Sequence, residues 1–319
     1  MLDNSIIQEL DTHLKNCKKV LITGHRFPDT DSVGSCLALA HHLHAQGKIV
    51  QVWIPGEQIN DFHYLPSNDF LTSTIEPDYF YDLCIVCDCS ALDRVNKHLF
   101  IKNARHPFTL VNIDHHPDNC AFGDINCATK VSSVGELLFY IFTQLQWEIT
   151  KDIAICLYAA ISFDTGRFAY SNVEAHTFKA AMTLMEKGVD TYSLCQAMDE
   201  NKTAVDFELI KVAIDNLVVV EEKNYAYTVI PKDAPRGKVK VIDFIRQLKD
   251  CDCFIVFQEL QNKLVKVNLR SKHIVNVSEL SHRFDGGGHE RAAGILFKSD
   301  LDSAKKELFA ALDELDHEA

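Results

Sequence analysis

The 319-residue sequence has no long hydrophobic run. No stretch approaches the roughly 18 consecutive apolar residues that a membrane-spanning helix needs. The opening segment MLDNSIIQELDTHLKNCKK has the pattern of an amphipathic helix and lacks the charged and then apolar order of an export signal. We therefore expect a soluble cytoplasmic protein that has no membrane partner.

Basic side chains are scarce, since 32 Lys and Arg stand against 45 Asp and Glu, and the formal charge is −13. Such a surface repels polyanions, which disfavours a protein that follows long duplex nucleic acid. The segment 261–298 is an exception, because seven basic residues outnumber three acidic ones there. A basic face on an acidic protein suits a short phosphorylated ligand.

The sequence also has no low-complexity tract and no internal repeat, and its eleven cysteines are scattered through apolar runs. In a large chain without an export signal, reduced thiols are the rule, so we expect core residues and no disulfides. Cys84 and Cys87 should point to opposite faces of a strand, which argues against a thiolate zinc site.

Short apolar runs alternate with helical patterns in the first half of the chain. Strands are predicted over KVLITGH (19–25), KIVQVWI (48–54), YDLCIVCD (81–88) and FTLVNIDHH (108–116), and a helix from near Ser32 to Gly47. This alternation predicts an α/β fold with a doubly wound, mainly parallel sheet over residues 1–188. A helical linker (189–210) and a smaller C-terminal α/β domain (211–319) follow, since one core rarely exceeds roughly 250 to 300 residues.

Polar clusters stand at the ends of four apolar runs: GHRFPDTDS at 24–32, CDCS at 87–90, NIDHH at 112–116 and FDTG at 163–166. Ligand groups of parallel sheets gather beyond the carboxyl ends of the strands, so we expect the four clusters to meet there. Together they supply six imidazole and carboxylate groups of the kind that holds two divalent cations. These six are His25, Asp29, Asp31, Asp88, His115 and Asp164.

The spacing suggests how the six residues divide between two cations. Asp29 and Asp31 lie two positions apart in one loop, so each can face one cation, with His25 on the first. Asp88 offers two oxygens, enough to bridge cations roughly 3.5 to 4 Å apart. His115 and Asp164 would complete the second site and leave a water of lowered pKa as the nucleophile.

Taken singly, each of these Asp residues could be an ordinary turn former or helix cap. The complete set in four clusters is what indicates a metal centre. His41, His42 and His44 lie in a predicted helix without an adjacent carboxylate, and we interpret them as solvated or packing side chains.

The triplet Asp114, His115 and His116 resembles the signature of the DHH phosphoesterase superfamily. The four clusters follow the order of that family's metal motifs, and GGGHERAAG at 286–294 resembles the signature of the DHH-associated C-terminal domain. Within the superfamily, the similarity is to NrnA-type enzymes, which degrade very short RNA and dephosphorylate 3′-phosphoadenosine 5′-phosphate (pAp). The resemblance implies two cations, usually manganese, bound by the six residues. It also implies that His116 lies near the scissile phosphate and that Asp114 orients His115, as ligating imidazoles generally require.

The C-terminal domain carries candidates for substrate binding. Gly286, Gly287 and Gly288 permit close backbone approach, so that successive amides can face a phosphate, although a hinge is the simpler alternative. Arg283 and Arg291 flank the triplet and favour an anion cradle.

Arg270 and Ser271 end another predicted strand, where a guanidinium can grip a terminal phosphate in two places. The resemblance assigns both residues, together with His289, to the phosphate and nucleobase of the substrate. The carboxylates of Asp285 and Glu290 lie beside the triplet and disfavour multiply charged ligands such as pAp.

These features predict a two-metal phosphodiesterase of very short oligonucleotides and of linear dinucleotides such as pApA and pGpG, with pAp phosphatase as an added expectation. Alternatives are a cyclic-dinucleotide phosphodiesterase, a RecJ-like exonuclease, a pyrophosphatase, and a nucleotide-binding sensor or RNA-binding module without turnover. The GGGH sequence argues against a pyrophosphatase, length and acidity against a RecJ-like exonuclease, and the complete ligand set against a sensor. The expected partner is short RNA or a dinucleotide, and a homodimer is one option for the assembly.

Overall fold

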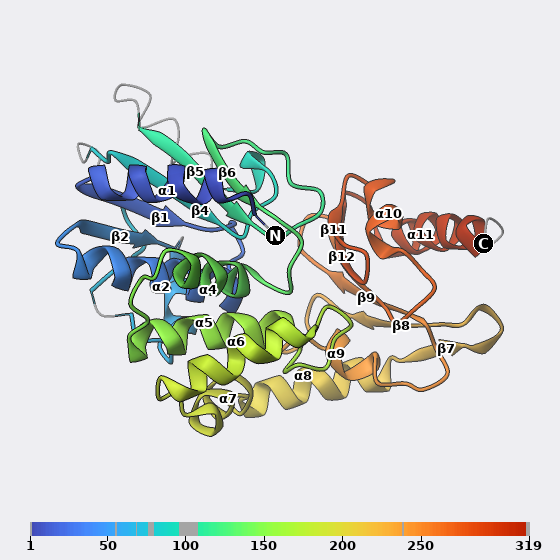
Figure 1. Ribbon diagram of the computed structural model, residues 1–319. Helices are drawn as coiled ribbons and strands as arrows, with labels where there is room; N and C mark the ends of the chain where they lie inside the picture. Colours follow the sequence, from blue (N-terminus) through green and yellow to red (C-terminus); the bar gives the residue numbers. More distant parts are fainter. Residues whose placement is uncertain are drawn as a thin grey trace. The chain divides into compact units, whose positions relative to one another are not determined.

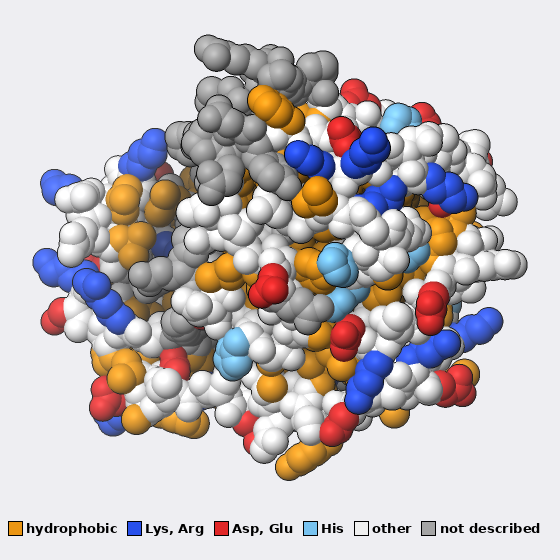
Figure 2. Space-filling model, turned by 90° about the vertical axis from the view of Figure 1, so that its left-hand side faces the viewer, with side chains coloured by type: hydrophobic (Ala, Val, Ile, Leu, Met, Phe, Trp, Pro, Cys, Tyr) orange, Lys and Arg blue, Asp and Glu red, His pale blue; other side chains and the backbone are white. Residues whose placement is uncertain are grey.

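The computed structural model of the protein describes residues 2–54, 56–67, 69–75, 80–95, 108–237 and 239–316 (Figure 1). The chain forms two compact units, Met1–Met198 and Asp199–Ala319. In the part of the chain that is described, no helix is both long enough and apolar enough to cross a bilayer. The face shown in Figure 2 carries its exposed apolar side chains in small groups, interrupted by polar and charged ones, as is usual for protein surfaces.

The N-terminal unit is built on a sheet of six parallel strands in the order β3-β2-β1-β4-β5-β6. The strands are β1 (Lys19–Thr23), β2 (Ile49–Trp53), β3 (Leu71–Thr72), β4 (Leu83–Cys87), β5 (Thr109–Asp114) and β6 (Ile125–Ala128). The predicted parallel α/β fold is confirmed. The sequence did not reveal β3 and β6, because one has only two residues and the other is a short run with a polar residue at its second position.

The strand order reverses between β1 and β4. From β1 the chain proceeds outward to β2 and β3, and then crosses to β4 and continues outward to β5 and β6. In open α/β sheets, the loops after the two strands that flank such a reversal leave in opposite directions and open a crevice between them. Open α/β sheets bind ligands at this topological switch point, so the fold itself marks where to look for a site.

Helices α1 (Asn4–Asn16), α2 (Thr30–Ala45), α4 (Val134–Gln144), α5 (Lys151–Asp164), α6 (Ala175–Glu186) and α7 (Thr191–Asp199) complete the unit, with short 3₁₀ turns at Gly56–Phe62 and Leu92–Arg94. Helix α2 begins two residues before the predicted Ser32, because Asp29 accepts the backbone N–H of Ser32 and caps the helix. Most of α2 is buried, and it packs on α5. Gly34 permits this close packing, since a Cβ there would lie 2.7 Å from the Cys156 carbonyl oxygen.

Side chains alternate between the two faces of the parallel sheet. Val20, Ile22 and Cys87 belong to the main core beneath α2, whereas Leu21 and Cys84 belong to a smaller cluster on the other face. The expected separation of Cys84 from Cys87 is therefore confirmed. All eleven cysteines are free thiols.

The C-terminal unit holds a mixed six-stranded sheet in the order β11-β12-β10-β9-β8-β7, in which only the β8–β9 pair is parallel among the described residues. Its strands are β7 (Val218–Val220), β8 (Tyr225–Ile230), β9 (Cys253–Glu259), β10 (Val265–Ser271), β11 (Gly287–His289) and β12 (Ala292–Phe297). Its helices are α8 (Ala204–Asp215), α9 (Ile242–Ile245), α10 (Val277–His282) and α11 (Leu301–Asp316), with a 3₁₀ turn at Glu221–Lys223.

Apolar side chains of α10 and α11 pack on one face of this second sheet, and those of α8 and α9 pack on the other. The segment predicted as a helical linker, 189–210, contains α7 and the first part of α8. These two helices belong to different units, and the division falls after Met198. The segment is therefore largely helical, and it is shared between the two units.

His42 is the buried member of the three helical histidines. Its side chain is buried and its ring stacks on Trp147, with centroids 4.1 Å apart. Burial lowers the pKa of His42 to about 4, although the charge of Asp11 opposes the shift. This packing role agrees with the sequence interpretation.

The protein should lose stability through His42 as the pH falls. The folded pKa of about 4 lies below the roughly 6.5 of an unfolded histidine, so the unfolded chain binds more protons between these values. Proton binding lowers the free energy of the unfolded chain relative to the folded one. Urea unfolding at pH 8 and pH 5 should show that His42→Phe removes about 2 kcal/mol of the pH-dependent loss. The exposed His44→Phe on the same helix is the control. Equal pH dependence in wild type and His42→Phe would contradict the expectation.

Candidate two-metal active site

The N-terminal unit brings all six predicted ligands to the carboxyl edge of its sheet. His25 follows β1 by two residues, while Asp88 and His115 come directly after β4 and β5. The other three are carried by helices: Asp29 caps α2, Asp31 lies in its first turn and Asp164 ends α5. Two expectations were wrong in detail, because Asp31 is helical and not in a loop, and the fourth cluster ends a helix and not a strand. Helices α2 and α5 pack together, and this delivers Asp31 and Asp164 to the same edge.

The donor atoms fall into two groups that share one residue. His25, Asp29 and Asp88 form the first group, and Asp31, Asp88 and His115 form the second, with the donor atoms of each group within 4.8 Å of one another. Asp88 Oδ2 lies 3.4 Å from His25 Nε2, and Asp88 Oδ1 lies 3.5 Å from His115 Nε2. One carboxylate therefore turns one oxygen to each group, as a bridging ligand does.

Asp164 joins the second group. Its Oδ2 lies 3.2 Å from His115 Nε2, and Asp31 Oδ2 lies 3.9 Å from the same nitrogen. In the first group, Asp29 Oδ2 lies 3.9 Å from His25 Nε2. The geometry thus groups His25 with Asp29, and Asp31 with His115 and Asp164, which the sequence left open because it did not say which of the two neighbouring aspartates goes with His25.

Asp88 occupies an unusual backbone conformation at the strand end. Its φ is 56°, in the left-handed region, and its N–H donates to the Ile113 carbonyl at 2.9 Å. Asp tolerates this region better than most residues, at a cost of roughly 1 to 2 kcal/mol. Strained backbone of this kind concentrates at functional sites, where the surrounding structure holds it in place.

Asp31 is fully buried and is held by a second helix. Its two oxygens accept the N–H groups of Val134 at 2.8 Å and Gly135 at 2.9 Å, at the start of α4. A helix N-terminus is electropositive, so it stabilises a carboxylate that would otherwise be costly to bury. A carboxylate has about four acceptor positions, and the two amides leave capacity for a cation.

The charges of the cluster perturb one another. Burial raises the pKa of Asp31 well above its ordinary value, and the charge of Asp88 raises it further; burial and Asp31 likewise raise the pKa of Asp164. Burial would also raise the pKa of Asp88, but hydrogen bonds from His115 and His25 hold it well below its ordinary value. Conversely, burial would lower the pKa of His25, but the hydrogen bond to Asp88 raises it to about 9.

This donor set fits two divalent cations. Neutral imidazole and carboxylate are ligands that manganese, zinc and similar ions accept. The four carboxylates of the cluster, Asp29, Asp31, Asp88 and Asp164, carry four negative charges, which two divalent cations would balance. Without cations, proton uptake by the histidines supplies part of that balance.

His116 and Asp114 form a pair, and this corrects the expected role of Asp114. Asp114 Oδ1 lies 2.8 Å from His116 Nδ1, whereas Nδ1 of His115 lies 3.2 Å from the carbonyl oxygen of Val131. Alternate residues of an extended segment point the same way, so Asp114 meets the second histidine of the triplet and not the first. Asp114 therefore orients His116, and a backbone carbonyl takes its place behind His115.

Sequence reasoning missed two amides behind this pair, the buried Asn112 and the half-buried Asn119. Asn112 lies in β5 and is fully buried, and Asn119 Nδ2 lies 2.5 Å from Asp114 Oδ2. One signal was available: the apolar strand FTLVNID contains a single amide at its centre. A buried polar group in such a strand needs a hydrogen-bond partner, so this amide indicates a further polar side chain nearby.

In the C-terminal unit, Arg270 and Ser271 lie at the end of β10, as predicted. Arg270 donates to the Leu269 carbonyl oxygen, and its Nε lies 4.0 Å from Asp243 Oδ1. The Ser271 hydroxyl is buried and donates to the Val275 carbonyl oxygen at 2.6 Å. These contacts fix the positions of both side chains at the end of the strand.

The glycine triplet forms less of a loop than expected. Gly287–His289 is the edge strand β11, which pairs antiparallel with β12, and only Gly286 precedes it. The glycines also serve packing, because a Cβ at Gly288 would lie 2.3 Å from the Ala292 carbonyl oxygen. An edge strand pairs with a neighbouring strand on one side only. The Gly288 carbonyl oxygen also accepts the Ser278 hydroxyl at 2.8 Å.

The flanking arginines are engaged within the unit. Arg283 donates to Glu314 at 3.0 Å, and Arg291 lies 2.7 Å from Glu290 and donates to the Val275 carbonyl oxygen. The expectation that both belong to an anion cradle receives no support from these contacts, because neighbouring carboxylates already take up their charge.

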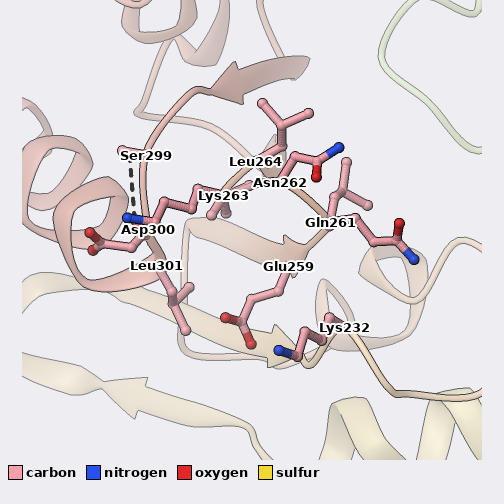
Figure 3. A pocket seen from close by; sticks show the side chains of 11 residues that line it. Lys232, Glu259, Gln261, Asn262, Lys263, Leu264, Ser299, Asp300 and Leu301 are labelled. Atoms are coloured by element: carbon pink, nitrogen blue, oxygen red, sulfur yellow. Dashed lines mark hydrogen bonds between the residues drawn. The ribbon is translucent and has the colours of Figure 1, made fainter.

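A separate cavity of about 420 Å³ lies in the C-terminal unit, and Figure 3 shows its lining side chains around the turn between β9 and β10. The lining includes Lys232, Glu259, Lys263 and Asp300, but none of the predicted substrate-binding residues. Charges of both signs lie side by side here, which does not match a phosphorylated ligand.

Replacing the shared carboxylate should disrupt both cation sites. Asp88→Asn halves the oxygen ligands available at this position and removes a negative charge, so Mn²⁺ affinity should fall by at least roughly 100-fold at one or both sites. Isothermal titration of metal-free protein with Mn²⁺ measures the number and affinity of sites. Asp118→Asn, at an exposed residue that pairs with Arg94, is the matched control. Unchanged Mn²⁺ binding in Asp88→Asn would contradict the two-cation arrangement.

Comparison with known proteins agrees with this architecture. The probable bifunctional oligoribonuclease and PAP phosphatase NrnA of Streptococcus mutans is 28% identical over 290 residues, which cover 88% of this chain and 90% of that protein. The bifunctional oligoribonuclease and PAP phosphatase NrnA of Bacillus subtilis is 27% identical over 86% of this chain and 88% of its own length. A crystal structure of an exopolyphosphatase-related protein from Bacteroides fragilis has the same fold, with a TM-score of 0.88 at 24% identity and coverage of 98% and 96%.

Both units match known domains. Residues 19–161 match the DHH family, N-terminal domain, and this range includes every predicted ligand except Asp164. Residues 222–317 match the DHHA1 domain, and they include Arg270, Ser271 and the glycine strand. With a DHH domain, a DHHA1 domain in the expected order and relatives similar over most of its length, the chain belongs to the DHH family.

Proposed function

We propose that the protein is a metal-dependent phosphodiesterase that hydrolyses very short oligonucleotides and linear dinucleotides such as pApA and pGpG. The observation that carries the proposal is the position of Asp88 between two donor groups. Paired divalent cations are a recurring device for in-line displacement at phosphorus. The relatives named as oligoribonuclease and PAP phosphatase support the substrate class.

The six ligands would hold two cations, and we propose manganese. His25 and Asp29 would bind the first cation, Asp31, His115 and Asp164 the second, and Asp88 both. The chemistry that bound cations supply is Lewis-acid charge at the phosphoryl oxygens and a water of lowered pKa. The residues themselves fix the site, since Asp31 is held by the amides of α4 and Asp88 by its backbone hydrogen bond.

His116 is the candidate for proton transfer to the leaving oxygen. Its Nδ1 faces Asp114, which puts Nε2 on the opposite side of the ring, where a substrate oxygen could meet it. Its ring lies 4.8 Å from that of His115. Burial opposes protonation of His116, but the bond to Asp114 raises its pKa above the ordinary value. A protonated imidazole at this point can donate to an oxygen that gains charge.

The C-terminal unit would recognise the remainder of the substrate. Arg270 can offer two parallel N–H donors to a phosphate, and the backbone of Gly287 and Gly288 lies on an edge strand. Gly286, Ser271 and His289 complete the proposed set. Anchoring a phosphate at a fixed place limits the length of ligand that fits, which explains a preference for short substrates. We propose pAp 3′-phosphatase as the weaker activity, because Asp285 and Glu290 adjoin the glycine strand.

Purified protein with Mn²⁺ should cleave pApA and pGpG faster than pAp, and all of these faster than cyclic di-AMP or longer RNA. Chromatographic assay of nucleotide products at equal substrate concentrations measures the order, and EDTA should abolish every activity. Faster cleavage of cyclic di-AMP would favour a cyclic-dinucleotide phosphodiesterase. Tight binding of the nucleotides without turnover would favour a sensor.

Arg270→Ala should separate substrate recognition from chemistry. The KM for pApA should rise by roughly 10- to 100-fold, since a bidentate charged contact is lost, while hydrolysis of bis-p-nitrophenyl phosphate should change little. Lys266→Ala provides the matched control, because it removes an exposed basic residue from the same strand. Equal losses on both substrates would show that Arg270 acts on the fold or the chemistry instead.

A further inference from the structure

Asn112 is a buried amide in β5, between the neighbouring strands β4 and β6. It has no exposed surface and stands in β5 between apolar neighbours. Its Nδ2 donates to the carbonyl oxygens of Cys89 at 3.0 Å and Val86 at 3.4 Å. Since the nitrogen donates to a residue of β4 and to the second residue after that strand, the Oδ1 oxygen must find a donor elsewhere.

Asn119 is that donor, and it connects Asn112 to Asp114. Its Nδ2 lies 2.8 Å from Asn112 Oδ1 and 2.5 Å from Asp114 Oδ2, and its own Oδ1 accepts the N–H of Ala121 at 2.8 Å. The Cys89 carbonyl oxygen lies 3.4 Å from Nδ2 as well, and all three atoms facing Nδ2 are acceptors, so the orientation of the amide follows from chemistry. Only a side chain with two donors on one atom can satisfy both neighbours.

Asp114 ends this chain of contacts at the active site. It is fully buried, with Oδ2 on Asn119 and Oδ1 on His116 Nδ1. A carboxylate with one partner can rotate about its last bond, whereas one with a donor on each oxygen cannot without losing a hydrogen bond. The orientation of the His116 ring therefore depends on the contact that Asn119 makes with the opposite oxygen.

We propose that Asn119 is a positioning residue for His116, acting through Asp114, and that Asn112 anchors it to strand β4. Asn119 fixes the orientation of the Asp114 carboxylate, and this carboxylate accepts the Nδ1–H of His116. The imidazole ring can then direct Nε2 toward the substrate. The kinetic part of this inference rests on the proposed function. Its structural part, the orientation of the ring, does not.

Asn119→Ala should lower kcat for pApA by roughly 10- to 100-fold, the loss typical of residues that orient a group at a metal site. KM and Mn²⁺ affinity should change by less than about 3-fold. The hydrogen bonds of the Asn119 side chain are to Cys89, Asn112, Asp114 and Ala121, and not to the six ligands or to Arg270. Asn126→Ala is the matched control. It removes an amide whose contacts are with the backbone of Gly123 in the same loop, so loosening of the loop alone should affect both variants equally.

A double-mutant cycle with His116→Ala tests the path of action. If Asn119 acts through His116, then Asn119→Ala should cost less than about 3-fold in the His116→Ala background. Asn119→Asp provides a second variant that keeps the shape of the side chain and places an oxygen opposite two acceptors. At pH 8, Asn119→Asp should lower kcat, as Asn119→Ala does. Additive losses in the cycle, or equal losses in Asn126→Ala and Asn119→Ala, would overturn the proposal.

A measurement without turnover separates this proposal from the proposed function. Long-range ¹H–¹⁵N spectra of the Mg²⁺-loaded protein report which imidazole nitrogens carry protons, with His116→Ala identifying the signal. Wild type should show His116 protonated at Nδ1, and Asn119→Ala should shift its ¹⁵N signals while those of His41 stay unchanged. If wild type fails to cleave dinucleotides but the His116 signals shift, only the proposed function falls. If the signals of the two proteins coincide, the positioning role falls.

Discussion

Repulsion between buried carboxylates is the constraint on which the N-terminal unit depends. Asp31 and Asp88 are almost entirely removed from water, and Asp29 and Asp164 stand beside them. Burying several like charges together is unfavourable unless positive groups surround them. The start of α4 supplies such groups to Asp31, and the two imidazoles supply them to Asp88. Two bound cations would complete the compensation, so the arrangement that is costly for the empty fold is the one that favours metal.

The topology makes this concentration of charge possible. Parallel strands end at one edge, and the reversal of strand order between β1 and β4 separates their loops enough to admit a ligand. Helices α2 and α5, which pack closely at Gly34, bring two further carboxylates to the same edge. Strands that are distant in sequence thus contribute one or two groups each, and no single segment could hold both cations.

The sequence was sufficient to predict the architecture and to single out six residues that lie together, because both depend on patterns of residue type. Alternating strands and helices predicted the parallel sheet, and polar clusters after apolar runs predicted the ligands, which the structure brings together.

Details that depend on helix geometry could not be predicted from such patterns. The sequence places Asp31 in a loop, since nothing near it in the chain shows that it accepts hydrogen bonds from α4, about a hundred positions away. Asp114 was paired with the wrong histidine, since spacing alone does not reveal which neighbour lies behind which ring. The glycine strand was read as a turn because three glycines carry no strand signal, whereas pairing with β12 decides their conformation.

Asp31 illustrates how one residue can come under two independent demands. The same carboxylate closes the first turn of α4 and faces His115 across the cation site. Lengthening it to Glu would displace the oxygens from the amides, and replacing it by Asn would keep only one acceptor oxygen. Evolution therefore has little freedom here, since a change tolerated by catalysis would still have to be tolerated by folding. In a copy of the gene released from selection for activity, we expect this position to drift more slowly than Asp29, which is only half-buried.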